Sequence, residues 1–334
     1  MRRLVAQKAV LAERPALMTP GWAGITFVTA LCLASPSAGL SDLPSFGATV
    51  DLVYVTVSVR DPQGKVVRGL GLDDFVLFED GHRRTISVVA NAAEPGEERN
   101  LALDLGLLFD TSESMAKEIR RAQESALRFL EAIPRARDLL VIFFDSDIRI
   151  SRYSNEQQQG LISRILETEG AGHTALYDAI IAYVSRVDDV PGRKALVLFT
   201  DGEDTTSDAS VKDMLDVVRS AGVTVYPVSF AEGSFGSTPT RLAVARALLS
   251  HLATASGGEI FSPLSSRDLP AVYERILDDL GGQYIVGFAP GASTKKGWRK
   301  LKVELTGKRK DHKLRYREGF TPQPATVSES PPGR

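Results

Sequence analysis

Three residues with short, oxygen-bearing side chains follow an apolar run in the first half of the chain. Leu105–Phe109 ends in Asp110, and Ser112 and Ser114 follow at alternate positions. The apolar run is typical of a buried parallel strand, and open α/β sheets hold their ligands beyond the carboxyl ends of such strands. Oxygen atoms are the ligands that a hard divalent cation prefers. The spacing therefore indicates a cation site.

Two later segments repeat this arrangement. Thr174 stands in a Gly-containing loop just before an expected helix, and Asp201-Gly202 follows a second apolar strand, Ala195–Thr200. In a parallel sheet the carboxyl ends of the strands share one edge. We therefore expect Asp110, Ser112, Ser114, Thr174 and Asp201 to converge there.

Each of these five residues also has an ordinary structural interpretation. Asp110, Ser112, Ser114 and Thr174 are of the types that cap helices, and Asp-Gly is a common turn. Only the combination of all five favours a metal site. Asp178, one helical turn after Thr174, is interpreted as structural support, and His173 as a surface-loop residue.

The combination resembles the metal-ion-dependent adhesion site of the von Willebrand factor type A family, over about 180 residues. The Asp-x-Ser-x-Ser loop of that family matches Asp110, Ser112 and Ser114, its threonine matches Thr174, and its third-loop aspartate matches Asp201. The resemblance implies that the hydroxyls coordinate the cation while the two aspartates act largely through water or hydrogen bonds. It implies Mg²⁺, or Mn²⁺, with Ca²⁺ less suitable, and one position open for an Asp or Glu of a partner protein. Segments such as GLGLDDFVLFEDG, QYIVGFAPG and REGF also resemble an exported bacterial subfamily in which a β segment lies on each side of the domain.

Three functions remain open at this point. The first is a non-enzymatic, metal-dependent adhesion or protein-binding module. The second is a magnesium-dependent, phosphatase-like hydrolase with Asp110 as the nucleophile; such enzymes need a second carboxylate two residues on, where this chain has Ser112. The third is a structural module whose metal site is vestigial.

The pattern of apolar segments predicts which elements position these residues. Between 101 and 281, short apolar strands alternate with amphipathic helices, which predicts an α/β fold with a doubly wound, mainly parallel sheet and helices on both faces. Residues 47–93 and 282–320 show the alternation and turns of β strands. In the first of these, residues 66–70, 74–81 and 83–90 are read as strand segments, and Asp80-Gly81 predicts a hairpin turn. Neither segment makes a comfortable sheet alone. We therefore expect the two to combine into a smaller, all-β, sandwich-like domain that flanks or receives the α/β domain, with two independent β appendages as the alternative.

Composition and the chain ends limit the class of protein further. The net charge is -2 without a long basic run, which argues against nucleic acid as a partner. Residues 1–38 show the order of basic residues, apolar core and small-residue cleavage site that is typical of an export signal, so we expect a periplasmic, secreted or cell-surface protein. An uncleaved N-terminal anchor is the alternative, and the only expected membrane contact. The single cysteine, Cys32, lies in this segment, which leaves thiolate metal sites and disulfides out of the remainder. Residues 321–334 are rich in Pro and Ser, as in disordered tails.

Overall fold

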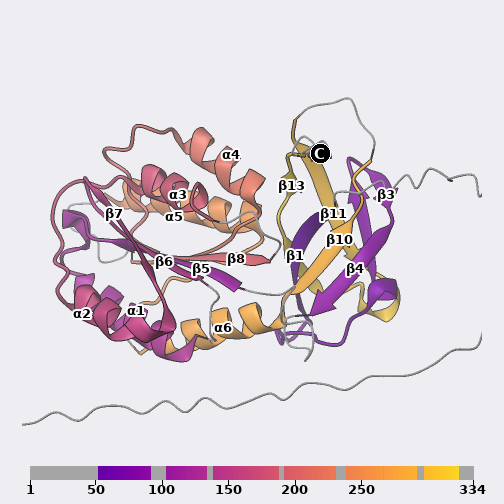
Figure 1. Ribbon diagram of the computed structural model, residues 1–334, viewed down its shortest axis with the longest axis horizontal. Coiled ribbons are helices and arrows are strands. Elements are labelled where there is room, and N and C mark those ends of the chain that lie inside the picture. The colour runs from indigo at the N-terminus through magenta and orange to yellow at the C-terminus, as the bar shows by residue number, and fades with distance from the viewer. Residues whose placement is uncertain are drawn as a thin grey trace, which may run out of the picture. The chain divides into compact units, whose positions relative to one another are not determined.

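A five-stranded sheet forms the centre of the α/β part of the protein, in the order β7-β6-β5-β8-β9 (Figure 1). Strands β6, β5, β8 and β9 are parallel, whereas β7 pairs with β6 in the antiparallel direction. The strands are β5 (Leu103–Asp110), β6 (Asp138–Phe144), β7 (Ile148–Tyr153), β8 (Arg193–Thr200) and β9 (Thr224–Ser229). Every residue of β5, β8 and β9 is buried or nearly so, which explains why these strands are continuous apolar runs in the sequence.

Helices cover both faces of this sheet, as the sequence predicts. In Figure 1, α3, α4 and α5 lie on one side of the sheet, and α1, α2 and α6 lie on the other. The helices are α1 (Ile119–Ala132), α2 (Gln158–Leu166), α3 (Leu176–Val184), α4 (Val211–Ala221), α5 (Pro239–Ser256) and α6 (Leu269–Gly282). Two separate apolar cores result, because alternate residues of each strand point to opposite faces.

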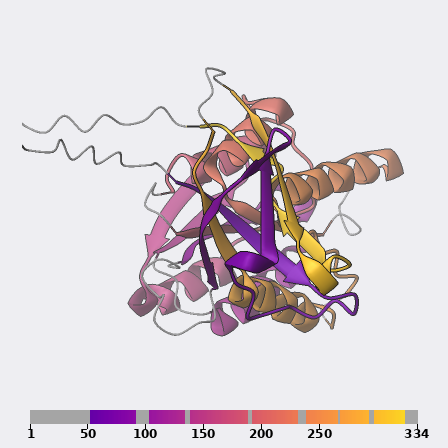
Figure 2. The same ribbon diagram turned by 90° about the vertical axis from the view of Figure 1, so that its right-hand side faces the viewer.

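Two small antiparallel sheets flank the α/β part and face the viewer in Figure 2. One has the order β12-β1-β10-β4 and the other the order β13-β11-β2-β3. Their strands are β1 (Val53–Arg60), β2 (Phe75–Glu79), β3 (His82–Arg84), β4 (Ile86–Asn91), β10 (Tyr284–Phe288), β11 (Arg299–Leu305), β12 (Lys313–Tyr316) and β13 (Gly319–Phe320). Each sheet takes strands from both flanking segments, and the two sheets enclose one apolar core. This is the sandwich-like β domain that the sequence predicts.

The strand limits within the sandwich differ from the sequence expectation in two places. Residues 83–90 read as one strand, but the chain passes from one sheet to the other at Thr85, between β3 and β4. Residues 66–70 also read as a strand, yet only Val66 makes a bridge, to Arg60. The expected hairpin at Asp80-Gly81 is present, with both residues at positive φ (48° and 81°), as a tight two-residue turn requires.

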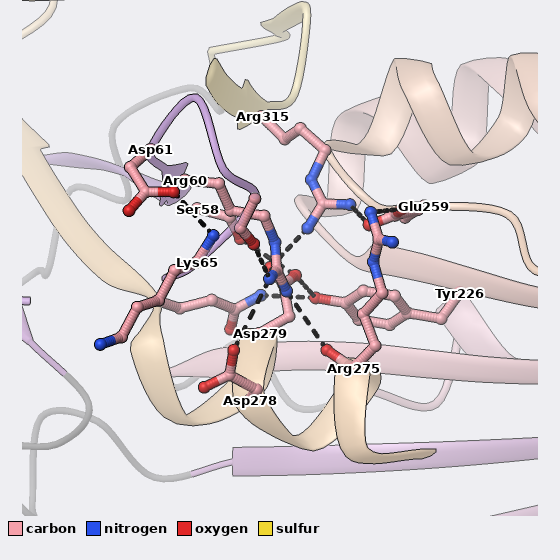
Figure 3. A network of polar contacts seen from close by, with 12 residues as sticks. Ser58, Arg60, Asp61, Lys65, Tyr226, Glu259, Arg275, Asp278, Asp279 and Arg315 are labelled. Atoms are coloured by element: carbon pink, nitrogen blue, oxygen red, sulfur yellow. Dashed lines mark hydrogen bonds and ion pairs between the residues drawn. The ribbon is translucent and has the colours of Figure 1, made fainter. Parts of the chain in front are cut away.

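The sandwich is joined to the α/β part by a buried carboxylate, Asp279, on α6 (Figure 3). Asp279 accepts hydrogen bonds from Ser58 Oγ (3.1 Å) and Arg60 Nη2 (3.3 Å) of β1, and from Arg315 of β12. Tyr226 of β9 donates to the same carboxylate at 2.6 Å. Burial, followed by the charge of Asp279, raises the pKa of Tyr226 well above its ordinary value, so this hydroxyl stays protonated. We refer to these five residues as the Asp279 network.

The structure is a computed structural model, and it describes residues 52–91, 103–133, 138–187, 192–230, 238–265, 267–291 and 297–322. The expected export signal, residues 1–38, lies outside these ranges, as does the expected tail apart from residues 321 and 322. Within the described ranges, no helix combines the length and the apolar character needed to cross a membrane.

Candidate functional site

The first loop of the candidate site is organised around Asp110, the last residue of β5. Its side chain is completely buried, and its Oδ1 atom accepts hydrogen bonds from the Ser112 backbone N–H (3.0 Å) and from Ser112 Oγ (2.6 Å). The hydroxyls of Ser112 and Ser114 are 3.1 Å apart. Ser112 is extended and precedes a short 3-10 turn, Glu113–Met115. The chain thus turns away from the sheet while keeping both hydroxyls beside the carboxylate.

Strand β8, which lies beside β5 in the sheet, brings a second buried carboxylate to the same edge. Asp201 directly follows β8 and has no exposed surface, and its Oδ1 accepts from the Glu203 N–H at 3.0 Å. The preceding residue, Thr200, donates from Oγ1 to Asp110 Oδ2 at 2.6 Å. Burial, and then the negative charge of Asp201, raise the pKa of Asp110 to about 7. Asp110 and Asp201 are therefore close enough to repel each other when both are ionised.

Thr174 lies in a loop that is bonded by its backbone to the first loop. The Glu113 N–H donates to Gly172 O (3.0 Å), and the Ala171 N–H donates to Thr111 O (2.8 Å). The two loops are in such close contact that a Cβ atom on Gly170 would lie 2.7 Å from Ala116 Cα. No larger residue fits at this point unless a loop moves. The close packing holds the first loop against the loop that carries Thr174.

The loop after Asp201 is bonded to Thr174 from the other side. The Thr174 N–H donates to Thr205 Oγ1 (2.8 Å), and Thr174 O accepts from the N–H groups of Thr205 (2.9 Å) and Thr206 (3.1 Å). Thr174 is almost fully buried between these loops. Asp178, interpreted from the sequence as structural support, accepts from the N–H groups of Asp208 (2.8 Å) and Ala209 (3.1 Å).

The structure thus places all five predicted residues on three loops at one edge of the sheet. Ser112 contacts both Asp110 and Ser114, and Asp201 is within electrostatic range of Asp110. The loop that carries Thr174 is joined to both neighbouring loops through hydrogen bonds. Their role as metal ligands stays a prediction. Sequence reasoning missed Thr200, although it directly precedes Asp201, and Asp145, which contacts Thr111 from the turn after β6.

The donor set fits a hard cation. The groups that donate hydrogen bonds to Asp110 are a backbone N–H and the hydroxyls of Ser112 and Thr200, all uncharged. The charge of a carboxylate that is fully buried among uncharged donors, as Asp110 is, is costly, because burial of charge needs compensation. A divalent ion among these oxygens would provide it. In the described ranges, no group of three or more His, Cys, Asp or Glu side chains could hold a metal ion, so a cation at this site would depend on the hydroxyls as ligands.

A known family model matches most of the α/β part of the chain. The von Willebrand factor type A domain model matches residues 104–275, which are 172 of the 334 residues. The chain belongs to this family. Von Willebrand factor type A domains generally mediate protein–protein binding, and many carry a metal-ion-dependent adhesion site.

Individual relatives of this von Willebrand factor type A protein are distant. A UPF0353 protein of Nocardia farcinica is 20% identical over a match of 208 residues, and the match covers 54% of this chain and 62% of that protein. The chain thus spans less than two thirds of the length of this curated relative. Among solved structures, a von Willebrand factor type A protein of Catenulispora acidiphila has a TM-score of 0.44 at 11% identity, and the match covers 81% of this chain and 74% of the Catenulispora chain. A mussel byssus protein, proximal thread matrix protein 1, was solved with zinc in its adhesion-site motif. Its TM-score is 0.42 at 17% identity, and the match covers 59% of this chain and 48% of the mussel chain.

Proposed function

We propose that this protein is a metal-dependent protein-binding module. In this proposal Ser112, Ser114 and Thr174 hold Mg²⁺, or Mn²⁺, through their hydroxyls, and Asp110 and Asp201 support the ion through water or hydrogen bonds. An Asp or Glu of a partner protein completes the coordination. The observation that carries the proposal is the pair of buried carboxylates, Asp110 and Asp201, next to uncharged hydroxyls at an edge of the sheet.

The chemistry of the donors favours capture of a carboxylate. Hydroxyl ligands do not cancel the charge of the ion, so the bound cation supplies an electrophilic position for a partner's acidic side chain. Ser112 Oγ donates its proton to Asp110, so it accepts from Ser114 Oγ, and one lone pair of the Ser112 oxygen remains for the ion. Such a site is expected to bind the metal weakly on its own, and more tightly when the partner is present.

The surroundings of Asp110 favour a non-enzymatic role over the hydrolase alternative. Both oxygens of Asp110 already accept short hydrogen bonds, from Ser112 and from Thr200, and the residue has no exposed surface. A nucleophilic carboxylate needs an oxygen that reaches the substrate. Ser112 also stands where such a hydrolase would carry its general acid.

The expected export segment extends the proposal to location. An exported protein with residues 1–38 removed would meet its partner in the periplasm, outside the cell or on the cell surface. If the segment remains as an anchor, it is the proposed membrane contact. Detecting whether residues 1–38 are present on the protein recovered from its native host, by intact-mass measurement, decides between the two.

Calorimetric titration with Mg²⁺ tests the metal site directly. We expect the wild-type chain to bind the ion, and Asp110→Ala and Thr174→Ala each to weaken binding by about tenfold or more, as loss of ligands or of their hydrogen-bonding partners does. Asp208→Ala is the matched control, because Asp208 lies on the same edge with an exposed side chain. Unchanged Mg²⁺ affinity in both site variants contradicts the proposal.

An affinity pull-down tests the binding function separately. The wild-type chain is used as bait with Mg²⁺ and with EDTA, and Asp110→Ala is used with Mg²⁺. A partner should be retained only by the wild-type chain with metal, and substitution of one acidic residue of that partner should release it. Retention that is indifferent to both EDTA and Asp110→Ala would mean that a different surface binds the partner.

A further inference from the structure

The turn between β6 and β7 contains a carboxylate that the proposed function does not use. Asp145 accepts hydrogen bonds from Arg149 Nη2 (2.5 Å) and Nη1 (3.2 Å), from Thr111 Oγ1 (2.9 Å), and from the Asp147 N–H (2.9 Å). Thr111 stands between Asp110 and Ser112, so this side chain is bonded to the middle of the first loop of the site. Arg149 Nη2 also donates to Thr111 Oγ1 at 3.0 Å.

The same turn is bonded to the loop that carries Thr174. The backbone oxygen of Asp145 accepts from the Ala175 N–H at 2.9 Å, directly after Thr174. The next residue of the turn, Ser146, accepts from the His173 N–H at 2.9 Å, directly before Thr174. The turn therefore contacts the chain on both sides of Thr174 and, through Thr111, between Asp110 and Ser112.

The contacts of Asp145 suit it to holding these two loops in place and not to binding a metal. Its side chain is 16% exposed and is ion-paired with Arg149, whose side chain is 39% exposed. Burial alone would raise the pKa of Asp145, but the hydrogen bonds from Arg149, Asp147 and Thr111 outweigh it, and the pKa lies below its ordinary value. The carboxylate is thus ionised and fully engaged by donors.

We propose that Asp145 is a positioning residue that sets the cation selectivity of the site. Its side chain holds Thr111, and its backbone oxygen holds Ala175. These hydrogen bonds fix the loop that carries the serine hydroxyls relative to the loop that carries Thr174. Mg²⁺ requires near-ideal octahedral geometry at about 2.0–2.1 Å, whereas Ca²⁺ accepts flexible geometry at about 2.3–2.6 Å. A rigid spacing therefore favours the smaller ion. The inference rests on the proposed metal-binding function.

The test compares Mg²⁺ and Ca²⁺ affinities of the full chain by calorimetry. For Asp145→Asn we expect Mg²⁺ affinity to fall by about tenfold, the loss typical when a group that orients ligands is changed, and Ca²⁺ affinity to fall much less. The ratio of the two affinities should therefore fall. Asp147→Asn is the matched control, since it makes the same substitution in the same turn on an exposed side chain and should leave both affinities unchanged.

Two variants of Thr111 make the test independent of how well Asp145→Asn folds. Thr111→Val removes the hydroxyl that donates to Asp145 and should reproduce the loss of selectivity, while Thr111→Ser keeps the hydroxyl and should retain wild-type values. A merely structural role for Asp145 would lower both affinities equally and leave their ratio unchanged.

The outcomes separate this inference from the proposed function. A wild-type chain that binds no Mg²⁺ overturns both. A wild-type chain that binds Mg²⁺, with Asp145→Asn and Thr111→Val showing the wild-type ratio of affinities, overturns only the role of Asp145.

Discussion

Asp110 and Asp279 are both almost completely buried, and their charges are compensated in opposite ways. Asp110, at the carboxyl edge of the five-stranded sheet, is 0% exposed. Asp279, on α6 where it contacts the sandwich, is 2% exposed. Asp279 receives two guanidinium groups, from Arg60 and Arg315, in addition to two hydroxyls. Asp110 receives only uncharged donors and lies near a second carboxylate.

The difference separates a structural carboxylate from one that is suited to a ligand. The charge of Asp279 is balanced within the fold, so nothing further has to bind there. The charge of Asp110 is stabilised by hydrogen bonds without being neutralised, which is an arrangement that a cation from solution can complete. Burial alone therefore says little about function, and the charge of the hydrogen-bonding partners decides.

The largest expected effect comes from removing the charge of Asp279. Asp279→Asn keeps the shape of the side chain but leaves Arg60 and Arg315 largely buried beside an uncharged group. Breaking a buried ion pair on one side costs about 3–5 kcal/mol of unfolding free energy. Urea unfolding in EDTA measures it.

The matched variant is Asp110→Asn, which removes a charge at an equally buried position that has no cationic donor. In EDTA it should cost nothing or stabilise the protein, because it relieves repulsion from Asp201. Equal losses in the two variants would break the distinction between the two carboxylates.

The second-largest expected effect is a dependence of the unfolding free energy on pH that is caused by Asp110. Burial and the nearby Asp201 raise the pKa of Asp110 from 3.8 to about 7 on folding. Between these values the folded protein retains a proton that the unfolded chain has lost, so the unfolding free energy should fall as pH rises from about 4 to 7. The loss is on the order of 2–4 kcal/mol.

Thermal or urea unfolding in EDTA across this pH range, with wild type and Asp110→Asn, measures the effect as a difference in slope. Adding Mg²⁺ should restore stability most at the upper end of the range, because an ion that binds only the folded state stabilises it and prefers the ionised carboxylate. Identical slopes in the two proteins would show that Asp110 does not titrate in this window.

The elements of the α/β part were predictable because their residues carry the pattern locally. Strands β5, β8 and β9 are buried on both faces, so each is an apolar run that ends in a polar residue at the sheet edge. Asp110 and Asp201 stand directly at the ends of β5 and β8, and Thr174 stands in a Gly-containing loop before α3, which is why the sequence indicates them as candidates.

The remaining features depend on contacts between distant segments. Nothing near Asp145 in the sequence indicates that it bonds Thr111, 34 residues away. Ser58 and Asp279 are separated by 221 residues. The break at Thr85 arises from pairing with strands of two different sheets, and a continuous β-like pattern does not reveal it. Local periodicity predicts elements and their ends, whereas cross-links between loops require the tertiary structure.

The smallest expected effect lies at the periphery of the Asp279 network. Arg68 Nη2 is 3.1 Å from Asp278 Oδ1, but the two side chains are 48% and 41% exposed. Solvent screens such a pair, so Arg68→Gln should change the unfolding free energy by less than about 1 kcal/mol, and less still at high salt. Urea unfolding at low and high salt measures this. A loss of unfolding free energy as large as that of Asp279→Asn would mean that the exposed and buried ion pairs act as one cooperative network. Burial would then no longer distinguish the charges that hold the sandwich to α6 from the charges that only lie near it.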